Sequence, residues 1–260
     1  MVAVLGGCAK TLTGDDITGS TGAPPVRSEQ EWRRHAETWG ERYRANPGDA
    51  RAAMEYGQAL RAIGQRAQAS AVLEQASIRH PQNKALLGDY GRALADTGRF
   101  QQALEVLNRA HTPDKPDWRV LSAQGAVLDQ LGRHQEAQRY YASALRIHPN
   151  DPGVLSNLGL SYALQKDLVR AEGTLRQAAE HKPIDPRVRQ NLALVVGLQG
   201  RFSEAEAIAG ADLPADKAAA SVAQLRQMLA QQKGKTTKPA RQRAQRPAAV
   251  SAKPAKDTRG

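Results

Sequence analysis

Small and apolar residues recur along most of this chain with a period of 34 residues, in five aligned blocks that begin at residues 50, 84, 118, 152 and 186. Two positions of the block stay small throughout, the eighth and the twentieth. Small side chains at these places let two helices approach closely, because a larger residue would hold their backbones apart. Each block is therefore predicted to be a helix-turn-helix unit, and the chain an all-α solenoid.

The columns of this repeat are regular. Position eight is glycine in the first four blocks, and position twenty is alanine in all five: Gly57, Gly91, Gly125, Gly159, and Ala69, Ala103, Ala137, Ala171, Ala205. Position fifteen is glycine except for Lys166 in the fourth block, and we expect the first helix to end there in a left-handed conformation. Position twenty-four is large and apolar, and we expect it to fill the space between hairpins: Leu73, Leu107, Tyr141, Leu175.

These columns resemble the tetratricopeptide-repeat (TPR) family over residues 50–217, and the resemblance implies a right-handed superhelix. Full repeats are predicted at 50–83, 84–117, 118–151 and 152–185. The block at 186–213 is degenerate, with Arg189 in an apolar column and Asp212 in a small one. Capping helices are expected at 28–49 and 214–231, so that the solenoid spans 28–231.

In the TPR family the concave face is lined by positions two, five, nine and twelve of the first helix. In this chain those positions change from polar and basic to small and apolar along the array. The resemblance implies a groove for an amphipathic helix or an extended apolar peptide, lined by Arg92, Arg119, Ser122, Ala126, Ser156, Leu160, Ala163, Arg187 and Leu194.

The N-terminal segment resembles a bacterial lipobox, in which small residues precede a cysteine that becomes lipidated. Leu5-Gly6-Gly7-Cys8 carries this pattern, and residues 1–8 read as the end of a signal peptide. The apolar run of Met1–Leu5 is shorter than a signal segment of about 7–15 residues, so we expect the signal peptide to begin upstream. Residues 9–27 are rich in Gly, Thr, Asp and Pro and are predicted to be a disordered tether between a membrane and the solenoid.

The net charge of +11 is concentrated at the other end of the chain. Residues 232–260 contain nine basic residues and one acidic residue, so the rest of the chain is nearly balanced. This composition predicts a disordered basic tail. We expect the tail to be solvated, with contacts to nucleic acid, lipid headgroups or an acidic protein left open as alternatives.

No catalytic motif emerges from the sequence. Lys233-Gly234-Lys235-Thr236 ends like a phosphate-binding loop, but Leu229 stands where that loop requires glycine. The six histidines show no metal-ligand spacing, and Cys8 is the single cysteine. We therefore expect a protein that is not an enzyme and that uses no cofactor.

The lipobox, the tether, the repeats and the closing segment Ser221–Ala230 together resemble the TadD-like TPR lipoproteins of the tight-adherence (Flp) pilus machinery. The resemblance implies an outer-membrane lipoprotein on the periplasmic face that assists assembly of the pilus apparatus by binding a secretin subunit. Two alternatives stay open. One is a periplasmic TPR adaptor for cytochrome maturation or cell-wall enzymes, and the other is a cytosolic regulator whose tail binds nucleic acid.

Overall fold

The structure is a computed structural model that describes residues 28–244, with side chains described up to residue 231. The predictions on Cys8, on the tether at 9–27 and on the last part of the tail lie outside these residues. The described part forms twelve α-helices: α1 Glu29–Ala45, α2 Ala50–Ala62, α3 Arg66–Arg79, α4 Lys84–Asp96, α5 Phe100–Arg109, α6 Trp118–Gln130, α7 His134–Ile147, α8 Pro152–Leu164, α9 Leu168–Ala179, α10 Pro186–Leu198, α11 Phe202–Ala209 and α12 Ala215–Ala244.

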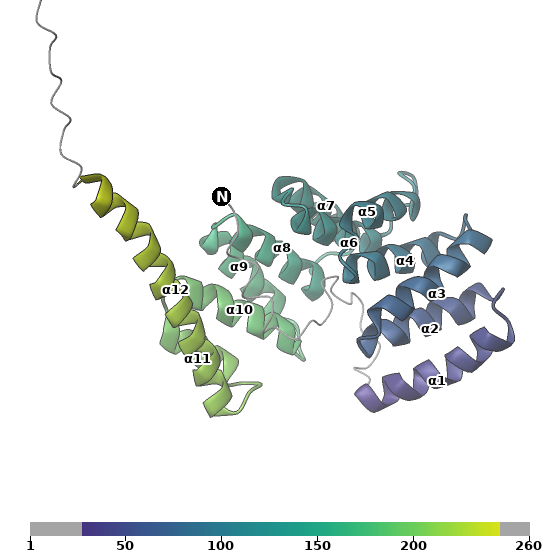
Figure 1. The fold of residues 1–260 in the computed structure, drawn as a ribbon, viewed down its shortest axis with the longest axis horizontal. Coiled ribbons are helices and arrows are strands. Elements are labelled where there is room, and N and C mark those ends of the chain that lie inside the picture. The colour runs from purple at the N-terminus through teal and green to yellow at the C-terminus, as the bar shows by residue number, and fades with distance from the viewer. Residues whose placement is uncertain (1–27, 245–260) are drawn as a thin grey trace, which may run out of the picture.

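Each helix packs on the next one along the chain, from α1 to α12 (Figure 1). Each block supplies one antiparallel pair, from α2 and α3 in the first block to α10 and α11 in the fifth. Helix α1 packs on α2 at one end, and α12 packs on α10 and α11 at the other. The prediction of an all-α solenoid with a capping helix at each end is therefore confirmed. No helix in the described part has the length and apolar character needed to cross a membrane.

Every first helix begins at an acidic or amide side chain that accepts backbone N–H groups of its first turn. The N-caps occur once per repeat, at Asp49, Asn83, Asp117, Asp151 and Asp185. These bonds satisfy donors that a helix leaves unpaired at its start. Among the second helices only α9 has such a cap, Asp167. The second helices α3, α5, α7 and α11 have no side-chain cap.

The turn inside each repeat passes through a left-handed residue. Gly64, Gly98, Gly132 and Gly200 have φ of 78°, 78°, 75° and 85°. This conformation carries no steric penalty for glycine because it lacks Cβ. Lys166 takes the same conformation in the fourth repeat, with φ of 66°, so this repeat bears a local cost of about 1–2 kcal/mol.

Position eight is the place where the two helices of a pair come closest. A Cβ placed on Gly57, Gly91, Gly125 or Gly159 would lie 2.6–2.7 Å from the side chain at position twenty-four of the same repeat. The alanines at position twenty are fully buried beside this contact. The large residue at position twenty-four therefore makes its tightest contact inside its own hairpin, whereas the sequence analysis placed it between hairpins.

The two residues that depart from the pattern in the fifth block contact each other. The Arg189 guanidinium donates a hydrogen bond to the Asp212 carboxylate, and both side chains are about four-fifths buried. Burying a charged side chain is costly unless it is paired. The ion pair explains how the terminal repeat tolerates a charged residue in an apolar column and another in a small one.

The closing helix is longer than the sequence predicted. Its first part packs by Ala218, Val222 and Leu225, and Leu225 lies directly over Gly197 of α10. The helical backbone then continues to Ala244, through residues 232–244 that the sequence analysis assigned to a disordered tail. Residues 232–244 contain alanine, glutamine, lysine and arginine, which have high helix propensity, but also Gly234 and Pro239, which oppose a helix, so propensity alone does not account for the extension.

One prediction tests the close approach of the paired helices. We expect Gly159→Ala to lower the free energy of unfolding by about 1–3 kcal/mol, since its Cβ would meet Leu175 at 2.7 Å and the carbonyl oxygen of Ala171 at 3.2 Å. Gly173→Ala is the matched control in the same repeat, because a Cβ added there would have no atom within 4 Å apart from the nearby backbone of its own helix. This control should be stabilising by about 0.5–1 kcal/mol. Urea denaturation measures both, and effects of equal sign would contradict the prediction.

Candidate functional site

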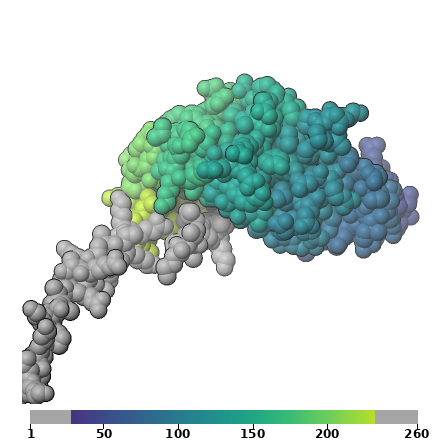
Figure 2. Space-filling model, turned by 90° about the horizontal axis from the view of Figure 1, so that it is seen from above, coloured from purple at the N-terminus to yellow at the C-terminus, as the bar shows by residue number. Residues whose placement is uncertain are grey.

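The first helices of the repeats line the inner face of the curved solenoid. Each first helix contacts the first helix of the next repeat, from α2 and α4 through to α8 and α10. Within the described part the backbones of successive second helices lie farther apart than this, and α9 and α11 are joined instead by the ion pair of Arg176 with Glu204. Elements on the inside of a curve lie closer together than those outside, so the first helices face the concave side. Figure 2 shows one face of the resulting body, along which the repeats follow one another from the N-terminal to the C-terminal end.

The N-terminal half of the inner face is ionic. Asp89 of α4 accepts hydrogen bonds from Gln58 Nε2 of α2 at 2.9 Å and from Arg92 Nη1 at 2.8 Å. Arg61 of α2 pairs with Asp96, also on α4. Burial lowers the pKa of the Arg92 guanidinium, and Asp89 opposes this effect. The predicted groove residue Arg92 is thus held by a carboxylate of its own helix.

The C-terminal half of the inner face is joined by amide and hydroxyl groups. Asn157 Nδ2 of α8 donates to Ser122 Oγ of α6 at 3.4 Å, and Asn191 Nδ2 of α10 donates to Ser156 Oγ of α8 at 2.9 Å. Both bonds join residues 35 positions apart in the sequence, so the same contact occurs in two successive repeats. Both asparagines are half-buried.

The structure divides the predicted groove residues into a floor and a lining. Ser122, Ala126 and Ser156 are at most 5% exposed and form the floor. Leu160, Ala163 and Leu194 are half-buried, so part of each side chain stays exposed.

The two predicted arginines at the edge of the groove are held by local contacts. Arg119 lies over the ring of Trp118 at 4.5 Å from its centroid. Arg187 binds Asp185, the N-cap of its own helix.

Sequence reasoning missed Asn157 and Asn191. Both occupy position six of their blocks, a column that was not considered, and asparagine there in two successive repeats was the available signal. Each asparagine precedes a groove leucine, Leu160 or Leu194, by three residues and lies on the same helix face. The pair therefore adds oriented polar groups to an apolar surface.

Asp129 stands between the two halves of the inner face. Its carboxylate lies 2.8 Å from His134 Nδ1 and accepts hydrogen bonds from Tyr141 Oη at 3.0 Å and Ser161 Oγ at 2.8 Å. Burial raises the pKa of the Asp129 carboxyl, while these three hydrogen bonds act in the opposite direction. One side chain thus connects α6, α7 and α8.

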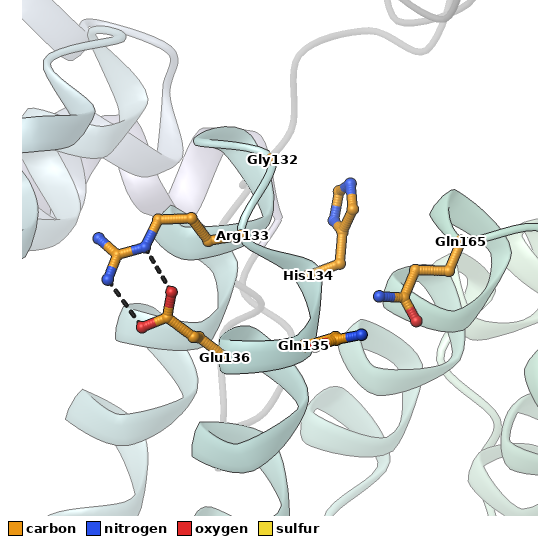
Figure 3. Close-up of a pocket in the computed structure, with 6 residues that line it drawn as sticks. All are labelled: Gly132, Arg133, His134, Gln135, Glu136 and Gln165. Carbon is orange, nitrogen blue, oxygen red and sulfur yellow. Dashed lines mark hydrogen bonds and ion pairs between the residues drawn. The ribbon is translucent and has the colours of Figure 1, made fainter.

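A shallow polar hollow lies beside the turn between α6 and α7 (Figure 3). Arg133 and Glu136 face each other there through two hydrogen bonds of 2.7 Å, and Gln165 reaches the hollow from the turn after α8. No group of three or more His, Cys, Asp or Glu side chains is placed to hold a metal ion within the described residues. Of the other side chains that line the hollow, His134 is bonded to Asp129 and Gln165 to Gln138.

The repeat and the geometry together define the class of protein. It is a solenoid of helix pairs with a concave face suited to protein binding. Tetratricopeptide-repeat family models match residues 57–117 and 130–195, so the chain carries TPR repeats. No curated protein sequence matches it.

Among solved structures, the chain resembles TTC0263, a thermophilic TPR protein of Thermus thermophilus. The identity is 25% and the TM-score is 0.60, over 67% of this chain and 98% of that one. It also resembles PilW, described as a widely conserved type IV pilus biogenesis factor. There the identity is 16% and the TM-score 0.63, over 74% and 91% of the two chains. The match to the APC/C hetero-tetramer Cut9-Hcn1 has 16% identity and a TM-score of 0.60, over 76% of this chain and 40% of that one. These likenesses establish a TPR solenoid.

A second prediction concerns the ionic half of the inner face. Asp89→Asn leaves the Arg92 guanidinium, only 17% exposed, without its counter-charge. We expect a loss of about 2–4 kcal/mol in the free energy of unfolding. Removing both charges in Asp89→Leu with Arg92→Met should recover much of this loss. The control is Arg33→Gln, which breaks the exposed pair with Glu29 and should leave the urea midpoint nearly unchanged. Equal midpoints for the Asp89 and Arg33 variants would contradict the prediction.

Proposed function

We propose that this chain is a scaffold that binds an extended segment of another protein in its concave groove. The observation that carries the proposal is the repetition of one surface unit on α8 and α10. Each unit has a half-buried asparagine held by a serine of the preceding first helix, with a half-buried leucine one turn later on the same face. A repeated unit suits a ligand that also repeats, such as an extended polypeptide.

The chemistry of the two units indicates what the segment contributes. Because Asn157 and Asn191 donate through Nδ2 to serine, each amide oxygen is oriented by that bond and can accept a backbone N–H of the segment. Leu160, Ala163 and Leu194 offer apolar surface to its side chains. The expected ligand is therefore an extended apolar peptide segment, bound through both backbone and side chains.

We further propose a place for this scaffold in the cell envelope, as a lipid-anchored outer-membrane protein that assists secretin assembly for a Flp-type pilus. The support comes from the sequence: the lipobox ending at Cys8 and the closing segment Ser221–Ala230. PilW and the Pseudomonas aeruginosa pilF protein share the solenoid at 16% and 18% identity, with TM-scores of 0.63 and 0.51. Because those likenesses concern the fold alone, the support for a pilus role comes from the sequence at the two ends of the chain.

A third prediction tests the groove. A photo-crosslinking amino acid at position 160 or 194, introduced in a bacterium that carries this protein with pilus genes, should capture a secretin subunit identified by mass spectrometry. The same amino acid at Val169, which is 80% exposed outside the groove, should not capture it.

Substitution by glutamine at the same three positions gives a matched comparison. We expect Leu160→Gln or Leu194→Gln to lower secretin recovery about tenfold through lost apolar contact, while Val169→Gln has no effect. Equal capture from all three positions would rule out the groove as the binding site. Capture of cytochrome-maturation or cell-wall proteins would replace the pilus role by that of an adaptor.

A fourth prediction tests the anchor. Expressed from a start upstream of Met1, the protein should incorporate labelled palmitate and fractionate with the outer membrane, and Cys8→Ser should abolish both. A soluble cytosolic protein that is indifferent to this substitution would contradict the envelope role. That result would favour the alternative in which the basic residues at 232–260 bind nucleic acid. Such binding should weaken steeply as the salt concentration rises.

A further inference from the structure

The two ends of the described solenoid are halves of different repeats. Helix α1 lies against α2 and not against α3, as the backbone of each second helix lies against the next first helix. Helix α12 lies against α10 and α11, as each first helix lies against both helices of the preceding repeat. The described part of the chain therefore begins with a second helix that has no first helix, and it ends with a first helix that has no second helix.

Helix α1 carries the large residue that a second helix places on its own first helix. Trp39 stands 34 residues before Leu73, so it occupies position twenty-four of the block that would precede the first one. Leu73 lies on Gly57, at the closest contact of α2 with α3. Trp39 is half-buried, and the guanidinium groups of Arg42 and Arg51 lie over its ring at 4.6 and 5.7 Å from the centroid. The face of α1 that carries Trp39 is therefore shaped for a first helix.

Position six of α2 points to the same missing helix. In three later repeats the residue at position six forms a hydrogen bond with the preceding first helix, and these residues are Asp89, Asn157 and Asn191. Position six of α2 is Glu55, which lies 3.0 Å from His35 of α1. The Glu55 side chain is 32% exposed, and a carboxylate can accept further hydrogen bonds beside this one.

Helix α12 repeats the burial pattern of α10 at an offset of 30 residues. Its buried residues Ala218, Val222 and Leu225 match the buried Val188, Leu192 and Val195 of α10. By the same offset Ala223 matches Ala193, the small residue at position eight, and Gln224 stands at position nine. Ala193 is buried with Ala209 of α11, whereas Ala223 and Gln224 are exposed. Ala223 therefore lies on the side of α12 where a second helix would pack.

Neither open end can be completed from the described part of the same chain. Figure 1 shows α1 and α12 at opposite ends of the solenoid. Residues 16–27 hold the place of the missing first helix by the 34-residue period, but they contain two glycines and two prolines, which oppose a helix. A second copy of the chain supplies both missing halves.

We propose that copies of this chain associate head to tail, so that α12 of one copy and α1 of the next form one shared helix pair. Trp39 of one copy then lies on Ala223 of the other, a large residue on a small one, as at position eight of the first four pairs. Gln224 Nε2 donates a hydrogen bond to Glu55, as glutamine and aspartate at the same two positions do between α2 and α4 at 2.9 Å. The shared pair thus continues the interface that the repeats already make.

The shared pair joins two different surfaces, so the contact is heterologous. Each added copy exposes the same two ends again, and association therefore continues into a longer superhelix and does not stop at a dimer. The concave grooves of successive copies then follow one another along one face. This inference concerns the ends of the solenoid and does not depend on what the groove binds.

Sedimentation of the full chain tests the association. Under reducing conditions, so that Cys8 cannot link two copies, the weight-average mass should rise steadily above 28.1 kDa between about 5 and 200 μM. Ala223→Gln puts a long neutral side chain at the closest approach and should lower the association constant about tenfold. Ala142→Gln makes the same change at an exposed alanine of α7 and should leave the constant unchanged. A mass that stays at the monomer value, or equal effects of the two variants, overturns the proposal.

The polar contact allows a test by loss and rescue. Gln224→Glu places two carboxylates opposite each other across the shared pair, and it should lower the association constant about tenfold. Adding Glu55→Gln to this variant restores one donor and one acceptor and should recover most of the loss. Both side chains are at least partly exposed, so folding is not at risk. An unchanged constant in the single variant, or no recovery in the double variant, would show that α12 does not pair with α1 in this way.

Mixing two variants tests the direction of the contact. Ala223→Gln leaves the α1 end intact, and Trp39→Ala leaves the α12 end intact. Each variant alone should stay largely monomeric, while an equimolar mixture should form a complex of two copies and no larger species. Because Trp39 also packs on the core, urea denaturation verifies that its variant is folded, and the two tests above do not depend on it. Dimers formed by either variant alone would indicate identical contacting surfaces and overturn the proposal.

Discussion

The close approach of paired helices at position eight determines most of this structure. With no Cβ at Gly57, Gly91, Gly125 and Gly159, a leucine or tyrosine from the partner helix lies directly on the backbone. The buried alanines of position twenty keep the same distance on the facing helix. Because this contact fixes each pair as a unit, the pairs can stack with one repeated geometry, and the curvature and the groove follow from that repetition.

Curvature has a chemical consequence on the inner face. First helices lie close enough to bond to one another, and they use polar side chains to do so, as in the contacts of Gln58 with Asp89 and of Asn191 with Ser156. A polar groove residue in this solenoid can therefore have two roles, joining repeats and meeting a ligand. Ser122 serves the first role through its bond to Asn157, and Arg92 is held by Asp89 of its own helix, while Leu160 and Leu194 are half-buried and stay partly exposed.

The sequence predicted the fold well because the repeat encodes a local contact that recurs every 34 residues. Helix pairs and left-handed turns follow from columns read within one block, and the capping helices follow from the helical pattern of the segments on either side of the blocks. The pairing of Arg189 with Asp212 and the convergence of three helices on Asp129 were not predictable, since they join residues in different columns. The burial of individual side chains could not be predicted either. The position of a residue in its block tells which helix face it lies on, but not whether a residue of the next repeat covers it, as Asn157 covers Ser122.

The distribution of helix caps bears on how the solenoid responds to force. First helices α2, α4, α6, α8 and α10 each carry a side-chain cap, whereas the second helices α3, α5, α7 and α11 do not. A capped helix resists fraying by about 1 kcal/mol more than an uncapped one. If the chain is stretched along its axis, the outer layer should yield first while the inner layer stays ordered. The molecule would then lengthen mainly through its outer helices, while the first helices keep their arrangement.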